Sequence, residues 1–218
     1  MSTGLFARFK DPVSGLTHLA SAAAALVGII FLLRADAVSS RRAIVLAVYG
    51  VSLVLLFSAS ALYHLARTTT ARELLLRRID HSAIFLLIAG TYTPICVLAL
   101  PDPMGTILLV AVWTFAALGI LLKVFFFSKV PNWVSTALYI IMGWLAVIGI
   151  VPLVRNVPLG GLLWLLAGGV FYTGGAAIYS LKKLVIVPGF GNHEIWHLFV
   201  SAGAASHFIM IIAYIAAR

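Results

Sequence analysis

The sequence predicts an all-α integral membrane protein, a bundle of seven transmembrane helices. Of its 218 residues, 63% are hydrophobic and only 10% are charged, and the mean hydropathy is +1.13. A water-soluble domain of this size needs more polar surface than this composition supplies. Several apolar runs also reach the roughly 20 residues that a helix needs to cross a bilayer. We therefore expect a multi-pass protein of the cell membrane.

Proline and glycine divide the apolar sequence into segments with short connections. Pro101 and Pro103 separate the third segment from the fourth, Pro131 precedes the fifth, and Pro188 and Gly189 precede the seventh. Such residues interrupt helices, so they indicate the joints between spans. The seven helices, forming one membrane domain over residues 1–218, are expected at about 15–34, 43–65, 80–100, 104–124, 133–154, 159–181 and 193–216.

Basic residues predict the orientation, because cytoplasmic loops carry an excess of Lys and Arg. The end that holds the N-terminus carries ten of them: Arg8, Lys10, Arg67, Arg72, Arg77, Arg78, Lys123, Lys129, Lys182 and Lys183. The opposite end carries five: Arg34, Arg41, Arg42, Arg155 and Arg218. We therefore expect a cytoplasmic N-terminus and an external C-terminus. Topology also explains the net charge of +9, so membrane lipids and not nucleic acid are the expected partners.

Polar residues from distant segments converge at the predicted cytoplasmic end. His64 ends the second segment, Asp80 begins the third, and His193 and His197 begin the seventh. His193 and His197 are four residues apart, so they lie one turn apart on one helical face. Ionisable groups in a membrane usually face the bundle interior or a cavity. The topology thus predicts that these side chains meet at one depth.

The predicted cluster has the composition of a zinc site. Three imidazoles with one open position are typical of catalytic zinc, and His64, His193 and His197 are the candidate ligands. Asp80 is placed beside the metal water or behind a ligand histidine, where it orients the ring. Ser60 lies four residues before His64 on the same helical face and is expected to support the same site.

The remaining histidines are interpreted differently. His18 and His207 are expected to be interior residues that hydrogen-bond across helices, and His207 lies ~15 Å along the helix from His197. His81 is about 100° around the helix from Asp80, so a supporting or interfacial role is expected for it.

Five stretches of the sequence resemble the bacterial hemolysin III family, the prokaryotic branch of the progestin and adipoQ receptors, which include the adiponectin receptors. They are PVSGLTH at 12–18, SALYH at 60–64, DHSAIF at 80–85, AGTYTP at 89–94 and HEIWH at 193–197. The resemblance covers nearly the whole chain in order and spacing. It implies a seven-helix bundle with zinc near the cytoplasmic face.

The resemblance also assigns the site. It places the three zinc-binding histidines of the family at His64, His193 and His197, its aspartate at Asp80 and its serine at Ser60. Related receptors are linked to hydrolysis of ceramide-type amides, and bacterial members to membrane-fluidity homeostasis. The family name refers to a hemolytic activity.

Four functions are compatible with these residues. The first is a zinc-dependent hydrolase of a lipid amide or ester, with Asp80 as general base. The second is a non-enzymatic sensor of lipid state with structural zinc. The third is an intramembrane protease, because HEIWH matches HExxH with Glu194 as base, although no further ligand follows on a later helix. The fourth is a cytolytic membrane protein, which the uniformly apolar segments do not favour.

Overall fold

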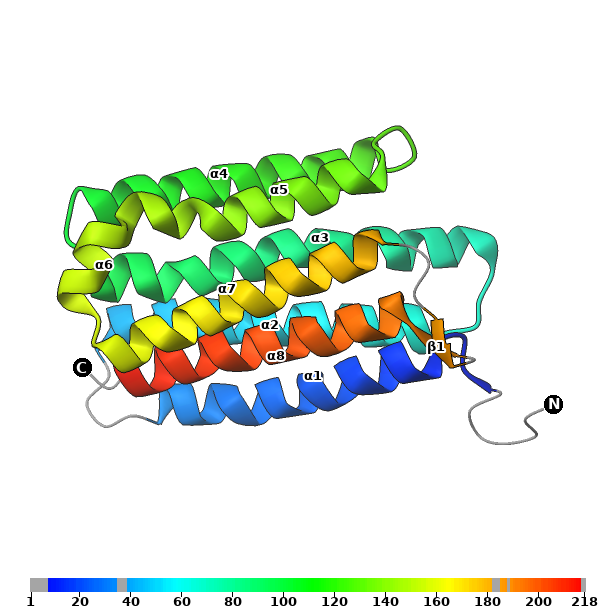
Figure 1. Ribbon diagram of the computed structural model, residues 1–218, viewed down its shortest axis with the longest axis horizontal. Coiled ribbons are helices and arrows are strands. Elements are labelled where there is room, and N and C mark those ends of the chain that lie inside the picture. Colours follow the sequence, from blue (N-terminus) through cyan, green and yellow to red (C-terminus); the bar gives the residue numbers. More distant parts are fainter. Residues whose placement is uncertain (1–7, 35–38, 182–184, 188, 217–218) are drawn as a thin grey trace.

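The structure is a computed structural model that describes residues 8–34, 39–181, 185–187 and 189–216. Long helices run side by side along the longest axis of the molecule (Figure 1). In chain order the elements are α1 (Pro12–Leu33), α2 (Ser40–Leu65), α3 (Thr70–Pro94), η2 (Ile95–Ala99), α4 (Met104–Phe125), α5 (Asn132–Trp144), η3 (Leu145–Gly149), α6 (Ile150–Asn156), α7 (Leu159–Ser180), β1 (Val185–Val187), β2 (Phe190–Gly191) and α8 (Asn192–Tyr214).

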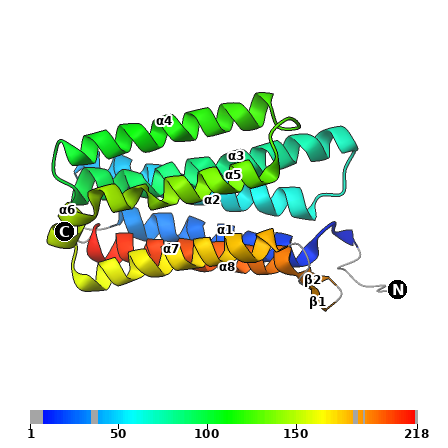
Figure 2. The ribbon, with the colours of Figure 1, turned by 45° about the horizontal axis from the view of Figure 1, so that its top comes forward.

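Seven helical spans in the described part of the chain are long and apolar enough to cross a membrane. This confirms the predicted seven-helix membrane bundle. The third span combines α3 with the π-helical turn η2, and the fifth combines α5, η3 and α6. In Figures 1 and 2, α4 lies on one side of the bundle and α1 and α8 lie on the other. The most extensive contacts join α7 to α8, α1 to α2 and α2 to α3.

The third helix begins ten residues before its predicted start at residue 80. Its first turns, from Thr70 onward, carry Arg and Glu side chains and are mostly exposed or half-buried. Straight-chain residues such as Leu, Arg and Glu favour a helix whether or not it lies in a bilayer. The prediction followed the apolar run alone and therefore missed this polar extension.

The fifth span contains a break that one phenol stabilises. The helix tightens into a 3₁₀ segment at η3, which frees backbone groups. Tyr92 of α3 donates its hydroxyl to the Met142 and Gly143 carbonyls at 3.0 and 2.7 Å, and it accepts the Ala146 N–H at 2.7 Å. Because unpaired backbone groups are costly within a bilayer, this contact explains how α5 can change its geometry there.

Glycines allow the close packing between neighbouring helices. A Cβ atom at Gly90 of α3 would meet the Ser52 hydroxyl of α2, and one at Gly119 of α4 would meet the Phe85 ring of α3. Small residues at such interfaces let helix backbones approach each other. They fix how far α2, α3 and α4 are apart, and hence how the polar residues at the helix ends are presented.

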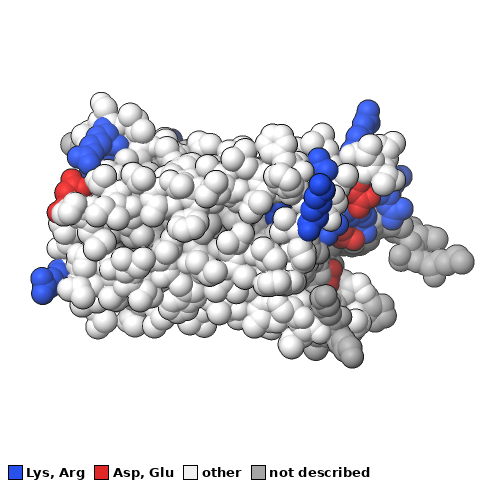
Figure 3. All heavy atoms as spheres, turned by 90° about the horizontal axis from the view of Figure 1, so that it is seen from above, with Lys and Arg blue, Asp and Glu red and all other residues white. Residues whose placement is uncertain are grey.

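Charged side chains gather at the two ends of the bundle, and the wall between them carries almost none on the face that Figure 3 shows. Such a wall suits the hydrocarbon layer of a membrane. We call the end where α1 and α8 begin and α2 finishes the N-terminal end. Which end faces the cytoplasm stays a prediction. Three of the basic residues counted for that prediction, Lys182, Lys183 and Arg218, lie outside the described residues, as does Pro188 before the seventh segment.

Candidate metal centre

Three histidines meet at the N-terminal end of the bundle. His64 comes from the last turn of α2, and His193 and His197 come from the first two turns of α8. Each offers a ring nitrogen, and these three nitrogens lie within 4.8 Å of one another. His64 and His197 are buried, and His193 is half-buried. The predicted grouping of the three residues is thus present, and it could hold a metal ion.

The ring nitrogens of this cluster are close enough together to share one cation. The Nε2 atoms of His193 and His197 are only 3.2 Å apart. The Nδ1 atom of His197 is buried and has no hydrogen-bond partner among the described residues. Neutral imidazoles that converge through their ring nitrogens form the donor set that zinc, copper, iron and nickel prefer. The residues present therefore fit a bound metal.

Asp11 holds His64 in place from outside the helices. Its Oδ2 atom lies 3.0 Å from His64 Nδ1, and its backbone N–H donates to the His64 carbonyl at 2.8 Å. A ring that donates Nδ1–H to a carboxylate presents Nε2 to a metal, which is a common arrangement around protein metal ions. Sequence reasoning missed Asp11. A carboxylate just before the first apolar run, at the same predicted end as His64, was the available signal.

A chain of charges extends from Asp11 to α3. Lys10 Nζ lies 3.6 Å from Asp11 Oδ2 and 3.0 Å from Glu73 Oε1. Partial burial opposes the charge on Lys10, but the hydrogen bond to Glu73 and the nearby acidic groups outweigh it and raise the pKa of Lys10 above its ordinary value. Lys10 therefore links the charged extension of α3 to the residue that orients His64.

Asp80 and Ser60, the other two predicted site residues, are paired with each other inside the bundle. Both side chains are buried, with 7% and 1% of their surface exposed, and they share a hydrogen bond. They line the same cavity as His64, His193 and His197. Asp80 is not among the described groups whose ligand atoms lie within 4.8 Å of one another. This places it near the cluster without making it one of the three grouped donors.

Glu194 caps the helix that carries two of the histidines. Its Oε2 atom accepts the Gly191 N–H at 2.8 Å, and Oε1 accepts the Ser14 hydroxyl at 3.4 Å. A Glu at the third helical position commonly reaches back in this way to satisfy the start of a helix. Its carboxylate thus has a structural task, which removes the main support for the HExxH protease hypothesis.

The other three histidines, His18, His81 and His207, lie outside the group of three. His18 is buried, its Nε2 is 3.3 Å from the His197 carbonyl, and the two rings are 4.1 Å apart between centroids. His207 Nε2 is 3.2 Å from the Leu165 carbonyl. The His81 ring packs against Phe127 at 5.5 Å. The first two are therefore hydrogen-bonded interior residues.

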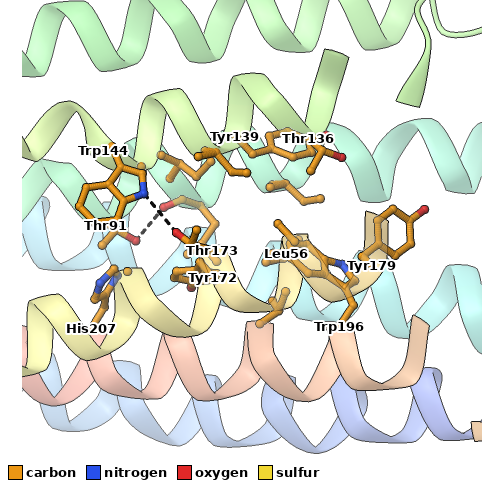
Figure 4. A pocket seen from close by; sticks show the side chains of 18 of the residues that line it. Leu56, Thr91, Thr136, Tyr139, Trp144, Tyr172, Thr173, Tyr179, Trp196 and His207 are labelled. Atoms are coloured by element: carbon orange, nitrogen blue, oxygen red, sulfur yellow. Dashed lines mark hydrogen bonds between the residues drawn. The ribbon is translucent and has the colours of Figure 1, made fainter. Parts of the chain in front are cut away.

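A cavity of about 440 Å³ leads from the histidine cluster into the bundle. It reaches from His64 and His193 to His207, which lies ten residues beyond His197 and hence ~15 Å along α8. The helix α5 makes few close contacts with α3 and α7, so space is left between them. Figure 4 shows Tyr139 of α5 facing Tyr172 of α7 across this space, and Trp144 of α5 donating its Nε1–H to the Thr173 hydroxyl of α7 at 3.1 Å. Its lining is mainly apolar and aromatic, which suits a hydrocarbon chain.

Comparisons with known proteins agree with the motifs. The model of a family described as "Haemolysin-III related" matches residues 6–208. "Hemolysin-3" of Bacillus cereus is 45% identical over 168 residues, which cover 77% of this chain and 74% of that protein. "Hemolysin-3 homolog" of Bacillus subtilis (strain 168) is 34% identical over 212 residues, 96% of each chain. "Monocyte to macrophage differentiation factor" of Homo sapiens is 29% identical over 175 residues, 77% of this chain and 69% of that protein.

Proposed function

The chain belongs to the haemolysin III-related family, and on this premise we propose that it is a zinc-dependent hydrolase of a lipid amide or ester that serves membrane lipid homeostasis. The observation that carries the proposal is the position of the histidine cluster. It lies at one end of an apolar cavity inside a membrane bundle, and one described carboxylate lines the same cavity. A lipid chain in the cavity would bring its carbonyl group to the cluster.

Zinc is the proposed metal, held by His64, His193 and His197. Three imidazoles leave one coordination position open for chemistry. Zinc in such a site supplies a Lewis acid that polarises a carbonyl group and makes water more acidic. Asp11 keeps the Nε2 lone pair of His64 available through its hydrogen bond to Nδ1.

Asp80 is the proposed general base. Among the acidic residues that the structure describes, it is the one that lines the cavity. It would accept a proton from the attacking water and return it to the leaving amine or alcohol as the carbon–nitrogen or carbon–oxygen bond breaks. Ser60 would orient its carboxylate through their hydrogen bond. The products would be a fatty acid and the amine or alcohol that carried the acyl chain.

The experiment measures fatty-acid release by mass spectrometry from ceramide, another N-acyl lipid and phosphatidylcholine. The purified zinc-loaded protein should cleave at least one of them. Asp80→Asn should lose turnover but keep zinc. Asp102→Asn is the control and should retain full turnover, because Asp102 lies in the connection before α4, at the opposite end of the bundle, where it contacts Thr106. Turnover by Asp80→Asn would rule out the proposed base.

A second function is favoured by the way the cluster joins α2 to α8. A metal held across two helices stabilises their packing, so the same residues suit a non-enzymatic sensor of lipid state with structural zinc. This function predicts a large effect of zinc on thermal stability and no cleavage of any lipid in the panel by wild-type protein.

A third function is suggested by the name of the Bacillus cereus relative, Hemolysin-3. If this chain is cytolytic, purified protein should release dye from liposomes at a low protein-to-lipid ratio. Retention of the dye would remove this function while leaving the other two.

A further inference from the structure

Three basic side chains surround one aromatic ring at the N-terminal end of the bundle. The Cζ atoms of Arg77 and Arg78 in α3 lie 5.3 and 5.9 Å from the centroid of the Phe127 ring. The Nζ atom of Lys123, in the last turn of α4, lies 5.0 Å from the same centroid. We call these four residues the Phe127 cluster. Three positive charges thus lie within 5.9 Å of a common point.

Two residues of the cluster, Lys123 and Phe127, are buried, and Arg77 and Arg78 are half-buried. Lys123 exposes only 2% of its surface and Phe127 only 9%. A buried ammonium group is costly unless an opposite charge lies next to it. The aromatic face and the C-terminal end of α4 each favour a cation to a modest extent. Neither removes the repulsion among three like charges at this separation.

The described carboxylates do not neutralise the cluster. None of its three basic residues forms an ion pair or hydrogen bond with another described residue, although Arg77 is close enough to Asp80 to influence its charge. The five acidic residues that the structure describes have other partners: Asp11 with His64, Glu73 with Lys10, Asp80 with Ser60, Asp102 with Thr106 and Glu194 with Gly191. The cluster therefore has positive charge in excess.

Two buried donors beside the cluster also lack partners. Arg78 Nε and Ser82 Oγ are both shielded from solvent and have no hydrogen-bond partner among the described residues. Arg78 and Ser82 are four residues apart in α3, so they lie on one helical face. Buried polar groups are nearly always hydrogen-bonded in folded proteins. Unpaired donors and a surplus of positive charge near one another suit an anion with several acceptor oxygens.

We infer that the Phe127 cluster binds the phosphate group of an anionic membrane phospholipid. Two guanidinium groups, an ammonium and a hydroxyl are the donors that recognise phosphate oxygens. The membrane wall begins directly beside Lys123, where Phe125 and Phe126 expose 68% and 47% of their surface. Acyl chains on that wall would place a head-group phosphate at the cluster, and basic residues at this level attract anionic lipids.

The site differs from the proposed metal centre. Arg77 lines the cavity, but Arg78, Lys123 and Phe127 do not. A phosphate group at the cluster would therefore lie where α3 meets the end of α4, next to the cavity and not within it. The inference goes beyond the proposed hydrolysis, because it requires neither zinc nor turnover.

The experiment titrates delipidated full-length protein in detergent with phosphatidylglycerol, phosphatidylcholine and inorganic phosphate, and counts bound molecules by native mass spectrometry. Phosphatidylglycerol should bind more tightly than phosphatidylcholine. Arg78→Gln should weaken its binding about fivefold, and Arg78→Gln with Lys123→Gln about 25-fold, since each basic contact near an anionic surface contributes about 1 kcal/mol. Inorganic phosphate at the same concentration should not displace the lipid.

Lys129→Gln is the matched control, because Lys129 is exposed and lies only two residues from Phe127. It should leave lipid binding unchanged. Thermal unfolding without lipid checks that each variant folds. If the double variant does not fold, the lipid affinity of Arg78→Gln alone tests the inference. Equal weakening in Lys129→Gln, or no preference for phosphatidylglycerol in the wild type, would overturn the inference. Displacement by inorganic phosphate would overturn the lipid as the source of the phosphate group.

Discussion

The carboxylate of Asp11 lies 3.0 Å from Nδ1 of His64, and the Asp11 N–H donates to the His64 carbonyl at 2.8 Å. The segment before α1 is thereby attached to the end of α2 through both side chain and backbone. These two contacts make Asp11 part of the candidate metal centre, although it lies outside the membrane spans.

Replacing Asp11 with Asn should weaken metal binding about 10- to 100-fold, the usual effect of removing the carboxylate behind a metal-binding histidine. An Asn side chain no longer stabilises the ring by charge. The measurement is competition for zinc with a chelator of known affinity. Asp102→Asn is the control, because Asp102 contacts Thr106 at the opposite end of the bundle. Equal zinc affinities of Asp11→Asn and the wild type would remove Asp11 from the site.

Removing the metal should destabilise the wild type and leave His64→Ala unaffected. Zinc at 1,000 times its dissociation constant stabilises a folded protein by about 4 kcal/mol, so chelation should lower the unfolding temperature of the wild type by several degrees. His207→Ala is the control, since His207 lies deep in the bundle and contacts Leu165. It should respond to chelation like the wild type. A response of His64→Ala as large as that of the wild type would contradict the assignment of His64.

Filling the cavity should block a lipid chain without disturbing the metal. Gly169 lines the cavity, and a Cβ atom added there meets no atom within 4 Å. Gly169→Leu should therefore lower the rate of lipid cleavage at least about tenfold, a loss of roughly 1.4 kcal/mol in transition-state binding, and preserve zinc content and stability. The neighbouring Val170 is 58% exposed, so Val170→Leu should leave the rate unchanged. Equal rates in the two variants would show that the chain lies elsewhere.

Tyr92→Phe should cost more stability than Tyr139→Phe. The Tyr92 hydroxyl pairs three backbone groups at the break between α5 and η3, whereas the Tyr139 hydroxyl pairs one, the His81 carbonyl at 2.8 Å. Each buried group left unpaired costs about 1–3 kcal/mol. Thermal unfolding of the two variants in the same detergent measures the difference. A smaller loss for Tyr92→Phe would contradict its stabilising contact with the break.

Replacing Glu194 with Gln should leave lipid cleavage intact. A Gln oxygen can still accept the Gly191 N–H, and the lost charge at the start of α8 costs about 0.3–1 kcal/mol. We expect a slightly lower unfolding temperature and unchanged turnover. Turnover abolished with zinc still bound would instead restore Glu194 as a catalytic base.

The sequence by itself determined the seven spans and the three candidate ligands. Span length follows from the apolar runs, and the pairing of His193 with His197 follows from helical periodicity. The position of His64 near them needed only the alternation of helix ends across a membrane. Each of these depends on local properties of one helix, or on counting helices.

Only the tertiary structure decided which other residues reach these positions. The contact between Asp11 and His64 joins residues 53 apart, the bonds of Tyr92 cross from α3 to the break in α5, and the Phe127 cluster joins α3 to α4. Such contacts depend on how far each helix is rotated and shifted against its neighbour. Close packing at small residues such as Gly90 and Gly119 sets that rotation, and no pattern within a single helix specifies it.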